Sequence, residues 1–272
     1  MVKKTFFLSI ASFYIKINFY LFTKKNYDYD LLFNIQELYN PYIVDRTIKI
    51  DFLINVFPKN EYFFLEKKGN HYLFIFERKK NKINILNNIS ISQFNYIITQ
   101  ILIELLAKTG FFFHGSVVLN KKNEALIFTG KSGSGKSTIS NLLSKKFKKI
   151  ADDSFFFKLE NNTYFVYTNP NDFAANNNCN SELYSIIKKG FPLRRIFFIK
   201  KAEYNKIYKI NNWLDLTKKM FQQIAVNENH KQTQLSSVIR FIKKNQEKIY
   251  YLYFKNDNDI VKFIEKNEKE ID

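Results

Sequence analysis

Residues 128–138 read FTGKSGSGKST and concentrate glycine, lysine and hydroxyl side chains in a chain with only 7 glycines among 272 residues. Gly130, Gly135, Lys136 and Ser137 match the pattern G-x-x-x-x-G-K-S/T. Glycine lets consecutive backbone N–H groups approach phosphate oxygens, because no Cβ obstructs them. A helix that starts here would add unpaired N–H groups and the positive end of its dipole. The stretch therefore predicts a phosphate-binding loop.

The side chains of this loop offer a cation and a metal ligand. Lys136 is expected to bridge the β and γ phosphates of a nucleotide, and Ser137 to hold Mg²⁺, so ATP and Mg²⁺ are the expected cofactors. A Gly/Ser turn that merely caps a helix is the alternative, and the full pattern and the scarcity of glycine elsewhere argue against it. The residues assigned to the nucleotide are Gly130, Lys131, Ser132, Gly133, Ser134, Gly135, Lys136, Ser137 and Thr138.

Two adjacent carboxylates follow the loop closely. Asp152 and Asp153 end the segment KKIADD, and Asp152 comes sixteen residues after Lys136. That spacing leaves room for a three-turn helix and a short strand that returns beside the strand before the loop. Two carboxylates at a strand end suit a division of roles, one on Mg²⁺ and one near a substrate hydroxyl as base. A turn or a helix N-cap at DDS is the alternative explanation.

A histidine stands shortly before the loop. His114 is one of 3 histidines, and Gly115 beside it would permit the close approach of a ligand. An imidazole near a γ-phosphate could stabilise charge in the transition state or tune a neighbouring acid. The alternative is a histidine that is hydrogen-bonded in or near the core.

The elements that position these residues can be predicted from hydrophobic periodicity. The segment FFFHGSVVLNKKNEALIFTG predicts two strands joined by a polar turn, with His114 on the first and the glycine loop directly after the second. Residues 137–148 predict a short amphipathic helix, KKIA a buried strand, and residues 152–170 an antiparallel hairpin. The order strand, loop, helix is the context that a phosphate-binding loop requires.

The N-terminal part of the chain is rich in aromatic and β-branched residues. Residues 1–88 predict a β-rich subdomain with strands in FYIKINFYLF, TIKIDFLINVF, EYFFLEKK and HYLFIFERKK, the last two joined by a turn at Gly69 and Asn70. A helix follows in SQFNYIITQILIELLAKTG, with Ser92 as its N-cap and Gly110 just past its end. We expect this helix at the seam with a catalytic domain over residues 89–272.

The first residues need a separate interpretation, because MVKKTFFLSIASFYIKINFYLF resembles a signal peptide. Lys16 interrupts the apolar run, no small-residue cleavage site follows, and apolar residues alternate at the strand period. We therefore expect one or two strands there. No run of eighteen uncharged apolar residues predicts a membrane span. The single cysteine, Cys179, indicates a reducing compartment, so a cytoplasmic location is expected.

The net charge of +18 raises the question of a nucleic-acid partner. Lys, Asn, Ile, Phe and Tyr are all abundant and share A/T-rich codons, so genome composition can raise the lysine content without selection for nucleic acid. Arginine, the better reader of bases and phosphates, is scarce. The composition therefore argues against nucleic acid as the partner. The sequence leaves the oligomeric state open, and a homo-oligomer is compatible with it.

The run FHGSVVLNKKNEALIFTGKSGSGKSTISNLLSKKFKKIADD resembles the nucleotide-binding core of HPr kinase/phosphorylase and its related kinases. The resemblance implies an α/β fold with a mixed-sheet phosphate-loop domain of the HPr kinase and phosphoenolpyruvate carboxykinase type. It also implies ATP-dependent phosphorylation of a hydroxyl, with Asp152 as base, Asp153 on the metal and His114 in the active site. The roles of the two aspartates could equally be reversed, since one sequence does not fix which of them faces the metal.

The C-terminal third of the chain extends the resemblance. The order of elements after Gly190 looks like that of short HPr-kinase-like proteins encoded with peptide-modifying enzymes, including lasso-peptide kinases. Gly190 is the only glycine after the phosphate loop, so the downstream glycine-containing signature of HPr kinases is missing. This departure argues against HPr as the acceptor and against phosphorylase activity. Arg194 and Arg195 could clamp a phosphoryl group, although such a pair more often begins a strand with its charges in water.

The sequence thus favours a kinase that transfers the γ-phosphate of Mg-ATP to a serine-like hydroxyl of a peptide, protein or small-molecule acceptor. The alternative is a nucleotide-binding switch or sensor without phosphotransfer. A transporter-type or nucleic-acid-linked ATPase is disfavoured, because no LSGGQ-like segment is present and the acidic pair follows the loop too closely.

Overall fold

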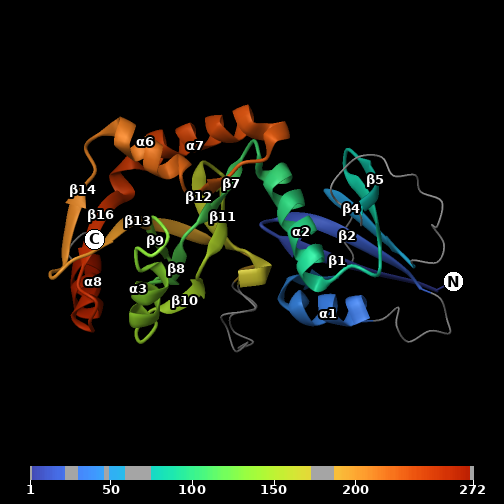
Figure 1. Ribbon diagram of the computed structural model, residues 1–272, viewed down its shortest axis with the longest axis horizontal. Coiled ribbons are helices and arrows are strands. Elements are labelled where there is room, and N and C mark those ends of the chain that lie inside the picture. Colours follow the sequence, from blue (N-terminus) through green and yellow to red (C-terminus); the bar gives the residue numbers. More distant parts are fainter. Residues whose placement is uncertain (1, 22–29, 46–48, 59–74, 173–186, 270–272) are drawn as a thin grey trace. The chain divides into compact units, whose positions relative to one another are not determined.

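Two mixed β-sheets, each with its own helices, organise the chain in the computed structural model (Figure 1). The structure describes residues 2–21, 30–45, 49–58, 75–172 and 187–269. The chain divides into a first unit, Met1–Leu105 with Ser181–Lys188, and a second unit, Leu106–Asn180 with Lys189–Asp272. The helix expected at the seam, α2 (Ile91–Leu106), belongs to the first unit in all but its last residue.

Six strands form the sheet of the first unit in the order β3-β1-β2-β4-β6-β5. They are β1 (Val2–Ile10), β2 (Phe13–Leu21), β3 (Ile43–Val44), β4 (Phe52–Phe57), β5 (Ile75–Lys79) and β6 (Lys82–Leu86). β1 and β2 form an antiparallel hairpin, so the apolar N-terminal segment is strand, as its alternation predicts. The strand expected over residues 61–68 and the turn at Gly69 and Asn70 lie outside the described residues.

Two helices pack together in the first unit. The ring of Tyr39, just after α1 (Asp30–Leu38), meets Phe94 of α2 edge-on at 5.8 Å. The sequence did not predict α1. The expected N-cap of α2 was also wrong, because the Ser90 hydroxyl accepts the Gln93 N–H at 3.2 Å while the Gln93 side chain accepts the Ser90 N–H at 2.8 Å. This reciprocal capping box makes Ser90, and not Ser92, the residue that starts the helix.

Ten strands form the sheet of the second unit, with β14 and β16 beside the path β10-β8-β9-β13-β12-β11-β7-β15. The strands are β7 (Gly110–His114), β8 (Ser116–Leu119), β9 (Ala125–Thr129), β10 (Lys148–Ala151), β11 (Ser154–Glu160), β12 (Thr163–Thr168), β13 (Phe191–Lys201), β14 (Lys206–Lys209), β15 (Ile224–Ala225) and β16 (Ile249–Phe254). β13 pairs in parallel with β9 and β16, and β11 with β12 is the predicted antiparallel hairpin. The unit is therefore α/β with a mixed sheet.

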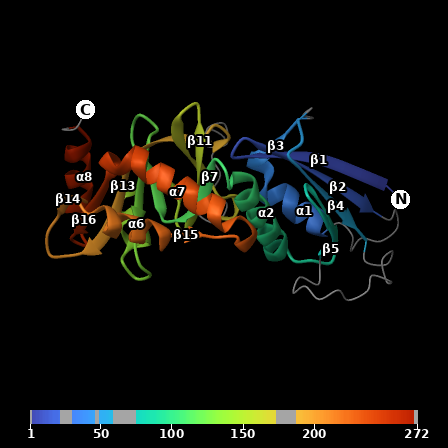
Figure 2. The same cartoon turned by 90° about the horizontal axis from the view of Figure 1, so that it is seen from above.

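Helices cover both faces of this sheet (Figure 1). α3 (Lys136–Leu143) and α8 (Asp259–Lys269) contribute Ile139, Leu143 and Ile260 to a buried cluster with residues of β9, β13 and β16. On the other face lie α6 (Trp213–Phe221) and α7 (Lys231–Asn245), the latter crossing the strands in Figure 2. The ring of Phe241 in α7 lies 4.5 Å from that of Phe157. No helix in the described part of the chain is long and apolar enough to cross a membrane.

Three details around the loop differ from the prediction. β10 does not return beside β9 but pairs antiparallel with β8, because β8 already occupies that edge of β9. The strand expected to carry His114 is divided at Gly115 into β7 and β8. A Cβ on Gly115 would lie 3.0 Å from the carbonyl oxygen of Phe128, a tight contact that glycine avoids. The predicted helix over residues 137–148 ends early, at Leu143.

Candidate functional site

β7 and β8 follow one another along the chain, and on one side they pair with β15 and β9, respectively. A pocket opens on that side, between the end of β9 and the start of β15. Ser116 pairs with Phe128 of β9, whereas Phe113 pairs with Ile224 of β15, so none of the described strands pairs with His114 and Gly115 on that side. The Thr129 hydroxyl donates to the carbonyl oxygen of His114 at 2.8 Å, which fastens the end of β9. Ligands of open α/β sheets bind at such breaks beside the carboxyl ends of strands.

The glycine loop connects β9 to α3, as the motif predicts. Gly130, Gly133 and Gly135 all have positive φ, at 151°, 76° and 99°. Gly135 is the N-cap of α3, and a Cβ there would lie 2.8 Å from the Phe254 ring and 3.1 Å from Lys201 Cε. The Lys136 ammonium donates to the carbonyl oxygens of Gly130 and Lys131 at 3.1 and 3.2 Å, so its charge lies inside the loop.

Asp152 is half-buried and held by three donors on one oxygen. Lys149 Nζ lies 2.9 Å from Asp152 Oδ1, and the hydroxyls of Ser140 and Ser116 donate to the same atom at 3.1 and 3.2 Å. Burial alone would raise the pKa of Asp152, but the Lys149 ammonium and the two hydroxyls outweigh it and hold the pKa below its ordinary value. Asp152 is therefore an anion fixed beside the first turns of α3.

A third carboxylate, from Asp172, fastens the backbone of the acidic pair. Its Oδ2 accepts the N–H groups of Asp152 and Asp153 at 2.8 Å and of Ser154 at 3.0 Å. Burial raises the pKa of Asp172, although these three bonds act in the opposite direction. Asp172 was not predicted as a site residue, because in the sequence TNPND it has only the features of an ordinary turn residue.

Asp153 and His114 face the pocket, which has a volume of about 390 Å³. The pocket is lined by His114, Gly130, Lys131, Ser132, Lys136, Asp153, Gln222 and Gln223. No described residue forms a hydrogen bond or ion pair with the carboxylate of Asp153 or the imidazole of His114, whose ring meets only that of Phe112, at 5.3 Å. The pocket thus holds an ammonium, a carboxylate and an imidazole, a set able to bind a phosphorylated ligand and to move a proton.

The structure brings together part of the predicted site. Gly130, Lys131, Ser132, Lys136, Asp153 and His114 meet at the pocket, whereas Gly133, Ser134, Gly135, Ser137, Thr138 and Asp152 do not line it. Gln222 and Gln223 were missed, since they follow α6 far along the chain and no local pattern singles them out. The Gln223 carbonyl accepts the His114 N–H at 2.7 Å, which holds this segment beside the histidine.

The residues present have the oxygen donors that Mg²⁺ prefers. Ser137 lies exposed on the first turn of α3, and the Ser140 hydroxyl donates to both the Ser137 carbonyl and Asp152 Oδ1. Among the described residues, the side chains that contact the Asp152 carboxylate all do so at Oδ1, which leaves Oδ2 for a further ligand. Among the described residues, no group of three or more His, Cys, Asp or Glu side chains is arranged to hold a metal ion by itself. Mg²⁺ bound with a nucleotide needs only one or two protein ligands beside phosphate and water, so the donors fit it.

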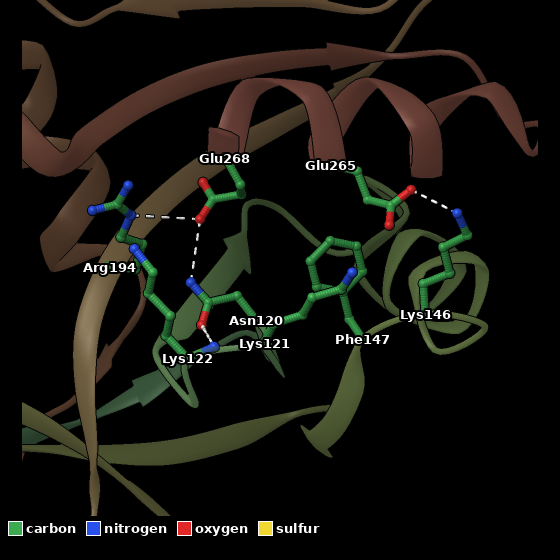
Figure 3. A pocket seen from close by; sticks show the side chains of 8 residues that line it. All are labelled: Asn120, Lys121, Lys122, Lys146, Phe147, Arg194, Glu265 and Glu268. Carbon is green, nitrogen blue, oxygen red and sulfur yellow. Dashed lines mark hydrogen bonds and ion pairs between the residues drawn. The ribbon is translucent and has the colours of Figure 1, made fainter. Parts of the chain in front are cut away.

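A second, smaller pocket of about 160 Å³ lies between the β8–β9 turn and α8 (Figure 3). Figure 3 shows Glu268 between Arg194 and Asn120, and Glu265 paired with Lys146 at 2.7 Å. Arg195 does not place its charge in water: it is 4% exposed and lies 2.8 Å from Glu268. Its partner on α8 explains the burial, since a buried guanidinium requires an anion. The arginine pair is thus part of α8 packing, at the other end of β9 from the loop.

The fold and the larger pocket beside the glycine loop define an α/β protein with a mixed sheet. A glycine loop, a lysine, a carboxylate and a histidine surround this pocket. The chain belongs to the ScmC family, described as SynChlorMet cassette protein ScmC, whose model matches residues 77–265. No curated protein matches the chain. The Hpr(Ser) kinase/phosphatase from Coxiella burnetii is a similar solved structure, with 12% identity and a TM-score of 0.23 over 49% of this chain and 97% of that chain.

Proposed function

We propose that the protein is a kinase that transfers the γ-phosphate of Mg-ATP to a hydroxyl of a peptide, protein or small molecule. One observation carries the proposal: the glycine loop with Lys136, the carboxylate of Asp153 and the imidazole of His114 all line one pocket. The match of the loop to the phosphate-binding pattern supports ATP as the donor. The HG, loop and DD motifs, which resemble those of HPr-kinase-like proteins, support a hydroxyl acceptor.

The loop and α3 bind the phosphates in this proposal. Lys136 leaves the carbonyls of Gly130 and Lys131 and places its ammonium on the β and γ phosphates, which are better acceptors than neutral carbonyls. Ser137 and Asp152 hold Mg²⁺, which neutralises phosphate charge when bound. The lowered pKa of Asp152 keeps it anionic for this role. We thus prefer the reversed order of the two aspartates, with Asp152 on the metal side.

Asp153 acts as the base. The acceptor's hydroxyl oxygen forms a bond to the γ-phosphorus while the bond from that phosphorus to the β–γ bridging oxygen breaks, and ADP leaves with that oxygen. The hydroxyl proton passes to the carboxylate of Asp153, which no described residue engages. His114 donates a hydrogen bond to the transferring phosphoryl group from the neighbouring wall of the pocket. Asp172 positions the base, because it holds the backbone N–H of Asp153.

The acceptor is best sought among the products of the cassette to which the family's name refers. The experiment incubates the full chain with Mg-ATP labelled in the γ position and with the small proteins and peptides encoded beside it, then maps added phosphate by mass spectrometry. Label on a serine or similar hydroxyl, absent with Lys136→Ala, is the expected result. Tight ATP binding with no transfer to any of these products or to water would instead identify a nucleotide switch.

Lys131→Ala is a suitable control for Lys136→Ala. Both lysines belong to the loop and line the pocket, but the Lys136 ammonium alone donates to loop carbonyls in the described structure. If loss of either lysine reduced transfer equally, general attraction by positive charge would explain the result, and the specific role of Lys136 would be wrong.

A further inference from the structure

Three tyrosines form an exposed aromatic group at the edge of the second unit's sheet. Tyr204, in the β13–β14 turn, is 52% exposed and stacks on Tyr253 of β16, with ring centroids 6.1 Å apart and planes 17° apart. Tyr208 of β14 is 37% exposed and meets Tyr253 edge-on at 5.4 Å. Solvent-exposed stacked rings of this kind present a flat apolar face to a ligand.

Lysines surround the group. Lys200 Nζ lies 5.6 Å from the centroid of the Tyr253 ring, and Lys206 Nζ lies 4.7 Å from that of Tyr208. The pairing registers explain this, because Tyr253 stands opposite Lys200 on β13 and opposite Lys206 on β14. Side chains of residues paired in this way lie on the same face of a sheet. The surface therefore combines π faces with positive charge, the combination on which nucleobases stack beside phosphates.

This surface adjoins the glycine loop through the ends of β13 and β16. Phe254, the last residue of β16, is the ring against which Gly135 packs, and its carbonyl accepts the N–H of Ala202 in the β13–β14 turn at 2.9 Å. The Asn205 side chain accepts the Lys255 N–H at 2.8 Å, which fixes the other side of this turn. β9, β13 and β16 are parallel, so the loop and the turn lie at the same edge of the sheet.

Lys201 stands between the loop and the tyrosines. Its Cε lies 3.1 Å from the Cβ position of Gly135, the N-cap of α3, and no ion pair to its ammonium occurs in the described part of the chain. Lys201 and Phe254 lie opposite each other on the face covered by α3, while Lys200 and Tyr253 lie on the other face. A ligand that starts at the loop thus passes Lys201 and crosses the strand ends to reach the tyrosines.

We infer that the nucleotide lies across the ends of β13 and β16, with Lys201 beside its phosphates and its base stacked on Tyr204. This inference rests on the proposed nucleotide-binding function and adds the subsite that receives the nucleoside. β13 lies between β9 and β16, so these two strands are two strand spacings, about 10 Å, apart. The diphosphate and ribose of a nucleotide bridge this span. The tyrosine surface continues directly from the loop, which favours the nucleoside over a polynucleotide or an acidic peptide. The pocket with Asp153 and His114 stays free for the acceptor.

The test compares Mg-ATP with Mg-tripolyphosphate, which has the phosphates but no nucleoside, by calorimetry on the full chain. Tyr204→Ala should weaken ATP binding by about five- to a hundredfold, the scale of base–aromatic stacking, and leave tripolyphosphate affinity unchanged. Tyr204→Phe should retain ATP affinity, because it keeps the ring. Lys201→Met should weaken both ligands by a similar factor. Tyr96→Ala, at a tyrosine that is 42% exposed in the first unit, serves as the control and should leave both affinities unchanged.

Each outcome decides one point. If Tyr204→Ala leaves the ATP affinity unchanged, the inference is overturned. Binding of both ligands by the wild type would in that case still support the loop as the phosphate-binding site. Equal weakening of ATP and tripolyphosphate in Tyr204→Ala, or a lowered melting temperature, would show a general disturbance and also overturn it. If the wild type binds neither ligand, the proposed function fails together with the inference. If Tyr204→Ala abolished binding of single-stranded DNA but not of ATP, the surface would belong to a nucleic acid.

Discussion

Replacing the two aspartates one at a time should separate the proposed base, Asp153, from the proposed metal ligand, Asp152. Asp153→Asn is isosteric and removes a carboxylate that no described residue engages. We therefore expect the free energy of unfolding to change by less than about 0.5 kcal/mol, as for other surface substitutions. Phosphoryl transfer should fall about 10²- to 10⁴-fold, the contribution of a positioned general base. Mg-ATP affinity should stay within a few-fold of wild type.

Asp152→Asn should show a different balance. Its Oδ1 receives Lys149 at 2.9 Å and the hydroxyls of Ser140 and Ser116 at 3.1 and 3.2 Å. Hydrogen bonds to a charged group contribute about 1.5–3 kcal/mol, but asparagine keeps a neutral acceptor and the partial exposure of Asp152 weakens the ion pair. The net loss should be about 1–2 kcal/mol. For a chain of this size the melting temperature then falls by about 2–8 °C.

The assay measures, on each variant, the melting temperature, ATP affinity by calorimetry, the Mg²⁺ concentration for half-maximal activity, and release of labelled phosphate to water or to an acceptor. Asp152→Asn should need more Mg²⁺, and Asp153→Asn should not. Full transfer activity in Asp153→Asn at normal Mg²⁺ would refute its role as base. The opposite pattern of Mg²⁺ dependence would show that the two roles are exchanged.

The other predictions concern single groups. Lys136→Ala should lower Mg-ATP affinity at least tenfold, because its charge bridges two phosphates; unchanged calorimetric titrations would contradict the loop assignment. His114→Ala should lower turnover about 10²-fold with an unaltered melting temperature, whereas a purely thermal effect would make it a structural histidine. The pKa of Asp152 is lowered even though burial opposes the shift, so the anion stabilises the fold fully above about pH 4, and this stabilisation is lost as the pH falls through the lowered pKa. In urea unfolding at a series of acidic pH values, the free energy of unfolding should therefore decline less steeply with falling pH in Lys149→Met than in the wild type. Ser90→Ala should destabilise the first unit by about 1 kcal/mol through loss of the α2 cap, and an equal effect of Ser92→Ala would contradict the assigned cap.

Sequence patterns predicted which helices and strands surround the site better than they predicted which strands pair with one another. Glycine spacing, the apolar run before it and the amphipathic run after it depend only on local chemistry, so strand, loop and helix were confirmed over β9 to α3. The prediction that β10 pairs with β9 was wrong, because β8 already occupies that edge of β9 and β10 pairs with β8 instead. No local sequence pattern records which edge of a strand is free. Ser90 was passed over for Ser92 because both are serines near the helix start, and only the reciprocal bonds with Gln93 distinguish them.

Residues that act through long-range contacts were missed for a related reason. Asp172 reaches the acidic pair across 20 positions, and its role exists only because β11 and β12 fold back as a hairpin. The two aspartates look alike in the sequence. They differ in the structure because Asp152 lies within reach of α3 and Lys149, while Asp153 is the next residue and so points away from them, into the pocket.

The long strand β13 has a mechanical consequence for the site. Its first residues pair with β12, and its later residues pair with both β9 and β16, so it belongs at once to the part of the sheet that holds the hairpin and to the part that holds the glycine loop. His114 and the loop come from these different parts, and they cannot separate unless β13 loses partners on at least one side. A rearrangement that moves one part of the sheet against the other therefore carries the free-energy cost of these broken strand pairs. In hydrogen exchange, the amides of Ile196 to Phe198, paired on both sides, should be among the last of the unit to exchange.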